Sequence, residues 1–180
     1  INAVGRLESA DPAVELLLTE SQEEADSIAD EIDLLNKERQ SIVKEMTQEA
    51  IEEVENNYPP ETNPVLIIAR EGWNTGVVGI VASKLVEKYY RPTIVLSIDR
   101  EKGTAKGSAR SIPGFDLFQN LSLNRELLPH FGGHPMAAGM TLKIEDVEEL
   151  RQRLVNQANE ILTEEDFQPV TEIDSLVAID

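Results

Sequence analysis

Glycines and small residues surround a histidine in residues 131–139, which read Phe-Gly-Gly-His-Pro-Met-Ala-Ala-Gly. Because glycine carries no side chain, backbone amides in such a segment can approach an anionic group closely. We therefore interpret the segment as a phosphate-contact loop that includes Gly132, Gly133 and His134. Two further glycine-containing segments lie upstream, and the three together indicate a site for nucleic acid or a nucleotide.

One upstream segment, residues 106–111, places an arginine between two serines and after a lysine. A planar guanidinium donates in a fork that matches phosphate geometry, and neighbouring hydroxyls add further donors. We expect Lys106, Ser108, Arg110 and Ser111 to contact phosphate or the sugar backbone. A salt bridge at a sheet edge is the alternative for Arg110.

The other upstream segment, residues 72–79, lies between a predicted strand and a predicted helix, where α/β proteins commonly carry binding groups. Trp73 and Asn74 are candidates there. Two interpretations of Trp73 are open, namely stacking on a base and core packing beneath the loop. Gly76 and Gly79 open the following helix, whose amide-rich start can hold an anion. The segment matches neither the dinucleotide-binding fingerprint nor the Walker loop.

His134 has three possible roles: hydrogen bonding to a phosphate, general acid or base catalysis, and metal ligation. Metal ligation has the least support, because the chain has only two histidines and the intervening glycines disfavour a helix that would place both on one face. The alternative is a histidine that only ties down its own loop. For His130 that structural role is the preferred interpretation.

A net charge of −18 disfavours nucleic acid as a partner, because phosphate binding depends on Lys and Arg. The charge is unevenly distributed, however. Residues 64–144 hold ten Lys or Arg against six Asp or Glu, whereas the flanks hold six against 28. The middle is therefore mildly basic, with a small patch formed by Arg100, Lys102, Lys106 and Arg110. We interpret Arg100 and Lys102 as ordinary solvated charges.

The 180 residues are 41% hydrophobic, which is enough for a compact core. There is no cysteine, so disulfides and thiolate metal sites are excluded and a reducing cytoplasm is favoured. No apolar run approaches the roughly 20 residues that span a bilayer, and the start lacks both a methionine and a basic signal region. We expect a cytoplasmic fragment whose parent continues on both sides, with a strand beginning at 176–180.

A long amphipathic helix of about ten turns is predicted after Ser21, which forms a capping box with Glu24. Apolar residues follow at steps of mostly three and four. They are Ala25, Ile28, Ile32, Leu35, Ile42, Met46, Ala50 and Val54. This stripe predicts a connector packed on a domain, with a coiled-coil dimer as the alternative.

Prolines between residues 59 and 64 end this helix, and an α/β domain with a mixed sheet is predicted beyond them. The predicted strands are 65–69, 93–98, 104–111 and 140–143, and the predicted helices are 13–18, 76–90, 116–121, 125–128 and 144–162. In the last helix Val147, Leu150, Leu154, Ala158 and Ile161 share the face expected to pack on the sheet.

Several of these segments, in this order, resemble the DHH phosphoesterase superfamily, and within it the bacterial exonucleases specific for single-stranded DNA. The matching segments are 1–7, 72–82, 91–92, 107–111 and 131–139. The resemblance covers nearly all of the chain. It implies that residues 1–20 end a DHH catalytic domain, 21–57 form a connector helix, 58–163 form the DHH-associated substrate-binding domain, and 164–180 begin an oligonucleotide-binding domain.

The resemblance also implies a parent enzyme that removes nucleotides from 5′ ends of single-stranded DNA in DNA repair and recombination, with a pair of Mn²⁺ or Mg²⁺ ions. The superfamily's metal-binding motifs fall outside this sequence, so the chain alone is expected to hold no cofactor and no catalytic residue. Its expected partners are single-stranded DNA and the catalytic and oligonucleotide-binding domains of the same chain, with no membrane.

By the same resemblance, Ser108, Arg110 and His134 are expected to bind phosphate. Trp73 and Asn74 are expected to line the same cleft, and Asn2 and Arg6 to face it from the end of the catalytic domain. Two alternatives stay open. One is a related phosphoesterase acting on oligoribonucleotides or cyclic dinucleotides, and the other is a non-enzymatic interaction module whose acidic flanks bind a basic partner.

Overall fold

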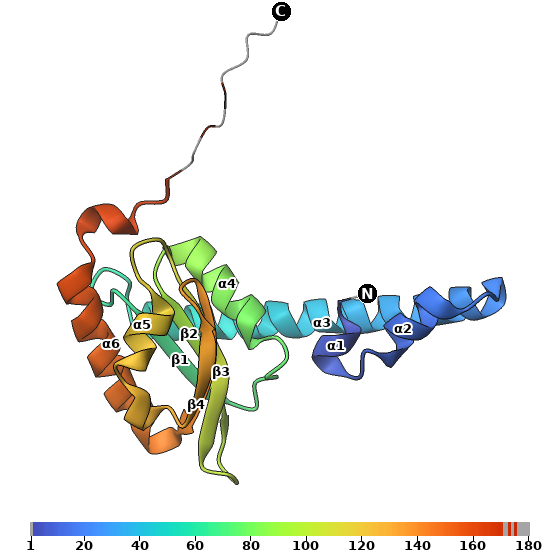
Figure 1. Ribbon diagram of the computed structural model, residues 1–180, viewed down its shortest axis with the longest axis horizontal. Coiled ribbons are helices and arrows are strands. Elements are labelled where there is room, and N and C mark those ends of the chain that lie inside the picture. The colour runs from blue at the N-terminus through green and yellow to red at the C-terminus, as the bar shows by residue number, and fades with distance from the viewer. Residues whose placement is uncertain (1, 171–172, 174, 176–180) are drawn as a thin grey trace, which may run out of the picture.

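A long helix, α3 (Gln22–Asn57), joins the two parts of the chain (Figure 1). The computed structural model describes residues 2–170, 173 and 175. Two short helices, α1 (Val4–Leu7) and α2 (Asp11–Leu18), lie along the N-terminal part of α3. An α/β domain lies at its C-terminal end, so the predicted helical connector is confirmed as a fold element.

The α/β domain contains a sheet, three α-helices and three short 3₁₀ turns. In chain order its elements are β1 (Leu66–Glu71), α4 (Val78–Tyr89), β2 (Thr93–Asp99), β3 (Thr104–Arg110), α5 (Leu117–Ser122), η1 (Arg125–Leu127), β4 (His130–His134), β5 (Ala137–Lys143), η2 (Ile144–Asp146), α6 (Val147–Ile161) and η3 (Glu164–Phe167). Strands β1 and β2 are parallel and joined through α4, and the other pairs are antiparallel. The strand order β1-β2-β3-β5-β4 confirms the predicted mixed sheet.

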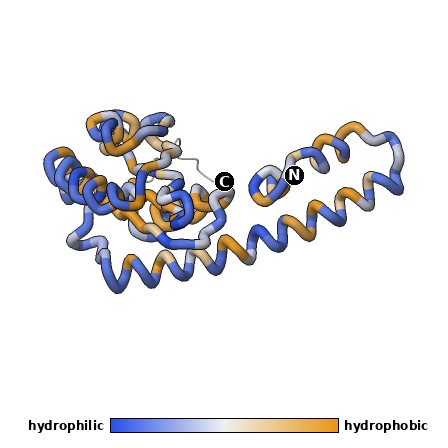
Figure 2. The backbone as a smooth tube through the Cα atoms, turned by 90° about the horizontal axis from the view of Figure 1, so that it is seen from below, coloured by the Kyte–Doolittle hydropathy of each residue, from blue (hydrophilic) through white to orange (hydrophobic). Residues whose placement is uncertain are grey.

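Helix α3 begins where its sequence predicts, because the Ser21 hydroxyl accepts a hydrogen bond from the backbone amide of Glu24 at 3.4 Å. Its apolar stripe packs on α1 and α2 near the start and on α4 and β1 near the end. Of the predicted stripe, Ile32, Met46, Ala50 and Val54 are buried, and Val43 is buried where Ile42 was expected. Figure 2 shows the stripe as orange segments along the helix. The apolar side chains that a coiled-coil dimer would need are thus packed against other elements of the same chain. No helix within the described residues is long and apolar enough to cross a membrane.

Helices pack on both faces of the sheet, and successive residues of a strand point to opposite faces. Ile67 and Leu96 contribute to the core beneath α5 and α6. Ile68 and Val95 contribute to the core beneath α3 and α4. Strands β1 and β2 are therefore buried on both sides, which explains their nearly continuous apolar sequences.

The loop predicted at 131–139 is wrong, because this segment forms the β4–β5 hairpin with its turn at Pro135 and Met136. Glycine usually weakens a strand, so paired glycines indicated a loop. Here they allow close pairing, since a Cβ added to Gly133 would lie 2.3 Å from the carbonyl oxygen of Ala137. Pairing with β5 stabilises residues 130–134 as a strand despite these glycines.

Two smaller expectations concern the C-terminal region. Ile161, predicted on the packed face of the last helix, is 49% exposed, and Leu162 packs in the core in its place. The reason is that α6 ends at Ile161 and the chain turns to an extended conformation at Leu162. The strand predicted at 176–180 lies outside the described residues.

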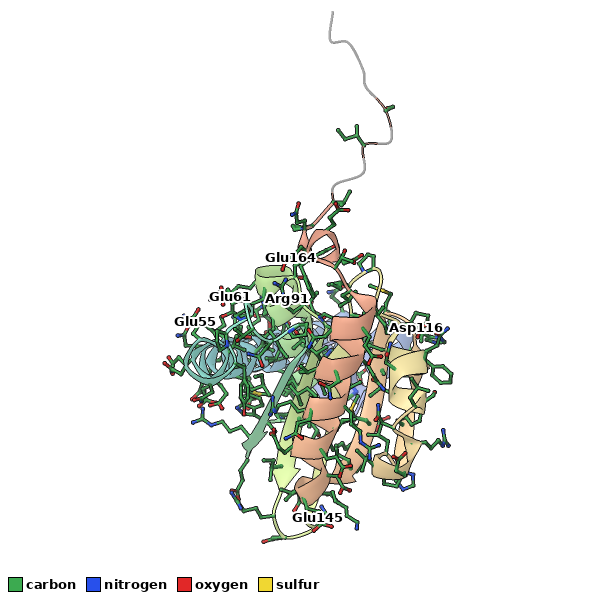
Figure 3. All side chains as sticks on the ribbon, turned by 90° about the vertical axis from the view of Figure 1, so that its left-hand side faces the viewer. Glu55, Glu61, Arg91, Asp116, Glu145 and Glu164 are labelled. Atoms are coloured by element: carbon green, nitrogen blue, oxygen red, sulfur yellow. The ribbon has the colours of Figure 1, made fainter. Side chains whose placement is uncertain are left out.

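Arg91 joins separate segments near the C-terminal end of α4. Its Nε donates a hydrogen bond to the carbonyl oxygen of Pro60 at 3.2 Å, and its guanidinium lies 3.8 Å from the ring centre of Phe167 in η3. Burial lowers the pKa of Arg91, and the charges of Glu164 and Glu61 oppose that shift. Figure 3 shows Arg91, Glu61 and Glu164 close together. Arg91 thus links η3 to the rest of the domain.

Gly107 allows β2 and β3 to approach, since a Cβ at this position would lie 1.9 Å from the carbonyl oxygen of Val95. We expect Gly107→Ala to lower the free energy of unfolding by roughly 1–3 kcal/mol, because the strands must separate to admit a methyl group. Urea denaturation measures this change. Gly132→Ala in β4 is the control, because nothing lies within 4 Å of its added Cβ. Equal losses in both variants would contradict the close approach.

Candidate nucleic-acid interface

The central strand β3 presents three polar side chains on one face of the sheet. Lys106, Ser108 and Arg110 alternate with Gly107 and Ala109. Ala109 lies in the core beneath α5 and α6, so the three polar residues point to the opposite face. This is the face on which α4 packs over β2 and β3. The alternation in the sequence therefore places three predicted phosphate contacts on a single side.

The β4–β5 hairpin extends this face beyond the helices. His134 aligns across β5 with Arg110, and His130 aligns in the same way with Lys106. The face that these strands present, called the open face below, comprises Lys106, Ser108, Arg110, His130, Gly132, His134, Ala137, Gly139 and Thr141. His130, Gly132 and His134 are exposed, whereas α5 lies against the hairpin from the core side.

Arg110 lies against the first turn of α4. A Cβ added to Gly79 would lie 3.0 Å from Nη2 of Arg110 and 3.4 Å from Oγ of Ser108, so only glycine leaves both groups undisturbed. The other guanidinium nitrogen, Nη1, donates to the carbonyl oxygen of Ala109 at 2.7 Å. This bond fixes the side chain and leaves the remaining donors available for a ligand.

Arg6 reaches the same place from the N-terminal segment. Its Nη1 donates to the carbonyl oxygen of Gly76 at 3.2 Å. The Asn74 side chain accepts from the backbone amide of Gly76 at 2.8 Å and shapes the loop before α4. Asn2 lies nearby, lining a hollow of about 580 Å³ with Arg6 and Gly76. The structure therefore brings Arg6, Asn74, Ser108 and Arg110 together around the start of α4.

Two guanidinium groups lie around the start of α4, Arg6 against Gly76 and Arg110 against Gly79. Burial lowers the pKa of Arg110, and the positive charge of Arg6 lowers it further. Arginine nonetheless stays protonated at neutral pH. In the described part of the chain, no ion pair includes Arg6 or Arg110. An anion bound between them relieves this repulsion, and the amides at the start of α4 favour the same charge.

Two predicted contacts, Trp73 and Ser111, serve the core instead. Trp73 is only 6% exposed, packs beneath α3 and α4, and donates from Nε1 to the Glu49 carboxylate at 2.7 Å. Its core-packing interpretation holds, and base stacking fails because the ring is covered. The buried Ser111 hydroxyl donates to the carbonyl oxygen of Phe115 at 2.6 Å, so it stabilises the chain after β3. The Trp73 contact joins residues 24 positions apart, whereas the Ser111 contact lies within a local turn.

The two glycine positions before His134 lie on opposite faces of the sheet. Gly132 shares the open face with His134, whereas Gly133 lies opposite Ala138 on the core side. Gly133 therefore serves strand pairing and presents no side-chain position to a ligand on the open face. His134 ends β4 in the same lateral row as Arg110 and remains a candidate phosphate contact.

His130, Thr141 and Arg125 lie together although the sequence offered no reason to group them. His130 was assigned a structural role, yet it is exposed on the open face and lines a groove with Lys106 and Thr141. Arg125, from η1, lines the same groove. Period-two alternation in residues 130–134 was the available signal for His130, and it was hidden by the glycines.

Arg100 and Lys102 are solvated charges, as predicted. Arg100 pairs with Glu71 at 2.6 Å and Lys102 with Asp99 at 2.7 Å, all largely exposed. Because their charges are already compensated, they add little to an anion site. The basic patch predicted from four residues thus reduces to Lys106 and Arg110.

A metal ion does not fit this part of the chain. Within the described residues there is no group of three or more His, Asp or Glu side chains placed to hold one. His130 and His134 lie four residues apart on one face of β4, with no carboxylate aligned between them across β5. The interface is equipped for anions rather than cations.

The family model described as the DHHA1 domain matches residues 62–160. The chain therefore belongs to the DHHA1 domain family, and the resemblance found in the sequence is confirmed at this level.

The similar proteins of known name are RecJ exonucleases. The chain is 62% identical over its whole length to the single-stranded-DNA-specific exonuclease RecJ of Bacillus subtilis strain 168, of which it covers 23%. A crystal structure of RecJ from Thermus thermophilus in complex with Mg²⁺ superposes with a TM-score of 0.79 at 27% identity, covering 90% of this chain and 24% of that one. A crystal structure of exonuclease RecJ bound to manganese gives 0.78 at 28% identity, covering 90% and 39%. The chain spans about a quarter of the length of the curated relative.

Trp73 is the only tryptophan, so its fluorescence tests its placement. We expect iodide to quench the folded chain weakly and the urea-unfolded chain strongly, because the ring is covered in the core. Adding a single-stranded oligonucleotide is expected to leave the emission intensity nearly unchanged. Strong quenching by the oligonucleotide would instead restore base stacking as the role of Trp73.

Gly76→Ala tests the contact between the N-terminal segment and α4. The added Cβ would lie 1.8 Å from the carbonyl oxygen of Arg6, so we expect α1 to move away and its amides to exchange with solvent faster. Hydrogen exchange read by mass spectrometry compares α1 with β3, which should stay protected. Gly5→Ala is the matched control, because its Cβ meets only Ala10 at an ordinary 3.7 Å. Unchanged exchange in Gly76→Ala would refute the contact.

Proposed function

We propose that this chain binds the 5′ end of single-stranded DNA as the substrate-binding part of a RecJ-type exonuclease. The observation that carries the proposal is the placement of Arg6 against Gly76, and of Arg110 and Ser108 against Gly79, around the start of α4. Their charges are uncompensated within the described residues, and the open face continues directly from them. The names of the similar proteins, single-stranded-DNA-specific exonucleases, support the same substrate.

In this proposal the terminal phosphate lies between the two guanidiniums. Arg110 donates from the nitrogens not used by its own backbone, and the Ser108 hydroxyl adds a donor from the same face. Arg6 donates from the opposite side while its Nη1 stays on Gly76. His134 aligns with Arg110 through Ala137 of β5, and in this proposal it contacts the adjoining sugar or phosphate.

Hydrolysis belongs, in the same proposal, to a DHH domain of the parent enzyme. Solved RecJ structures contain Mg²⁺ or Mn²⁺, and such ions activate water against a phosphodiester. The described residues here do not fit a metal ion. This chain therefore orients and retains the strand, and we expect it to cleave nothing by itself, even with added Mn²⁺.

The two other functions have less support. A phosphoesterase for oligoribonucleotides or cyclic dinucleotides would use the same phosphate site, and the similar proteins favour DNA over it. An interaction module would depend on the acidic flanks, yet the uncompensated charges of the described interface are positive. Competition among a DNA single strand, an RNA single strand, a cyclic dinucleotide and a basic protein separates these functions.

Binding of a fluorescent 5′-phosphorylated single strand tests the proposal. We expect Arg110→Ala to weaken binding at least roughly ten-fold, because a charge-assisted contact contributes about 1.5–3 kcal/mol. His134→Ala is expected to weaken it less, and chelating divalent metals is expected to have no effect. Arg100→Ala is the control, because it removes the same charge at a cation already paired with Glu71.

Equal binding by Arg110→Ala and Arg100→Ala, at both low and moderate salt, would remove Arg110 from the site. Absence of binding by the unmodified chain would contradict the proposal for this chain altogether.

A further inference from the structure

A groove of about 540 Å³ begins beside Ser108 and includes Lys106, Thr141 and His130 of the open face. None of the residues that line it is acidic, in a chain with 34 Asp and Glu. The next hollow beyond Lys106 is different, because its lining includes three carboxylates. They belong to Glu71, Asp99 and Glu101. The surface beside the Arg6–Arg110 site is therefore free of carboxylates along this groove, and carboxylates begin in the hollow beyond it.

The groove contains two cations that form no ion pair in the described part of the chain, Lys106 and Arg125. The guanidinium of Arg125 lies 5.0 Å from the ring centre of Phe131, which orients it without neutralising it. The adjacent carboxylate, Glu126, pairs with Arg153 instead. Both cations are exposed, so their charge is available to a ligand in the groove.

Three donor side chains of β3 follow one another at a spacing that suits a polynucleotide. Residues two apart on a strand stand about 6.6 Å apart on the same face, so Arg110, Ser108 and Lys106 form a row of donors in steps of that size. Neighbouring phosphates of an extended single strand are spaced comparably, and grooves of this kind track a nucleic-acid backbone. Gly132 and Gly139 leave the space beside this row without side chains.

We infer that this groove holds the backbone of the nucleotides that follow the terminal one, with Lys106 and Arg125 as phosphate contacts. The inference rests on the proposed function and goes beyond it, because it makes Arg125 a binding residue and makes affinity depend on strand length. An acidic peptide would match the same charges. The single strand is favoured because the groove is continuous with the Arg6–Arg110 site, where a phosphate is expected.

Two 5′-phosphorylated deoxythymidine probes test the inference in this chain, a dinucleotide and a hexanucleotide. We expect the hexanucleotide to bind more tightly. Arg125→Ala and Lys106→Ala are each expected to weaken the hexanucleotide roughly five-fold while leaving the dinucleotide unchanged. The slope of log affinity against log salt should fall by about 0.7 for each lost contact. Arg125→Lys should retain most of the binding, because it keeps the positive charge. Arg100→Ala is the control, because it removes one positive charge outside the groove.

The outcomes separate the inference from the proposed function. Arg110→Ala should weaken both probes, since it acts on the terminal phosphate. If the dinucleotide and hexanucleotide bind equally and Arg125→Ala changes neither, the groove is not used although the proposed function stands. If neither probe binds the unmodified chain, the proposed function fails and the inference with it. Displacement of the hexanucleotide by polyglutamate at equal affinity, lost in Arg125→Ala, would assign the groove to acidic peptides and overturn the inference.

Discussion

The close approach of α4 to its neighbours is the contact on which the interface depends. Gly76 accommodates the backbone of Arg6, and Gly79 accommodates the side chains of Arg110 and Ser108. A Cβ at Gly76 would lie 1.8 Å from the carbonyl oxygen of Arg6, and a Cβ at Gly79 would lie 3.0 Å from Nη2 of Arg110 and 3.4 Å from Oγ of Ser108. The start of α4 therefore serves as the joint between the N-terminal segment and the sheet. Without that joint, two arginines that are 104 positions apart in the sequence would not share one anion site.

The separation of acidic from basic side chains gives the proposed site at the start of α4 its selectivity for anions. Most acidic side chains lie outside the interface, and several are held by cations, as Glu71 is by Arg100 and Glu126 is by Arg153. The open face keeps its cations unpaired within the described residues. Within the described residues the open face is thus a restricted positive surface on a strongly negative chain, and such a charge distribution favours a polyanion at that surface over other parts of the molecule. Binding of this kind weakens steeply as salt rises.

Much of the fold and part of the site were predictable from the sequence, for identifiable reasons. The N-cap at Ser21 and the apolar stripe that follows specify α3, because the cap is local and the stripe is periodic. Alternation in 104–110 specifies the side of β3 that carries Lys106, Ser108 and Arg110. The hairpin at 130–143 was not predictable, because its glycines have low strand propensity and only the ladder to β5 offsets it.

Composition and local spacing specify which groups are available: an arginine between serines, glycines before a helix, and a mildly basic middle between acidic flanks. Tertiary structure alone decided which of them meet. It placed Arg6 beside Arg110, enclosed Trp73 and Ser111 in the core, and brought His130 and Arg125 to the edge of the open face. The physical reason is that burial and strand register depend on contacts between residues far apart in the chain, which local spacing does not encode.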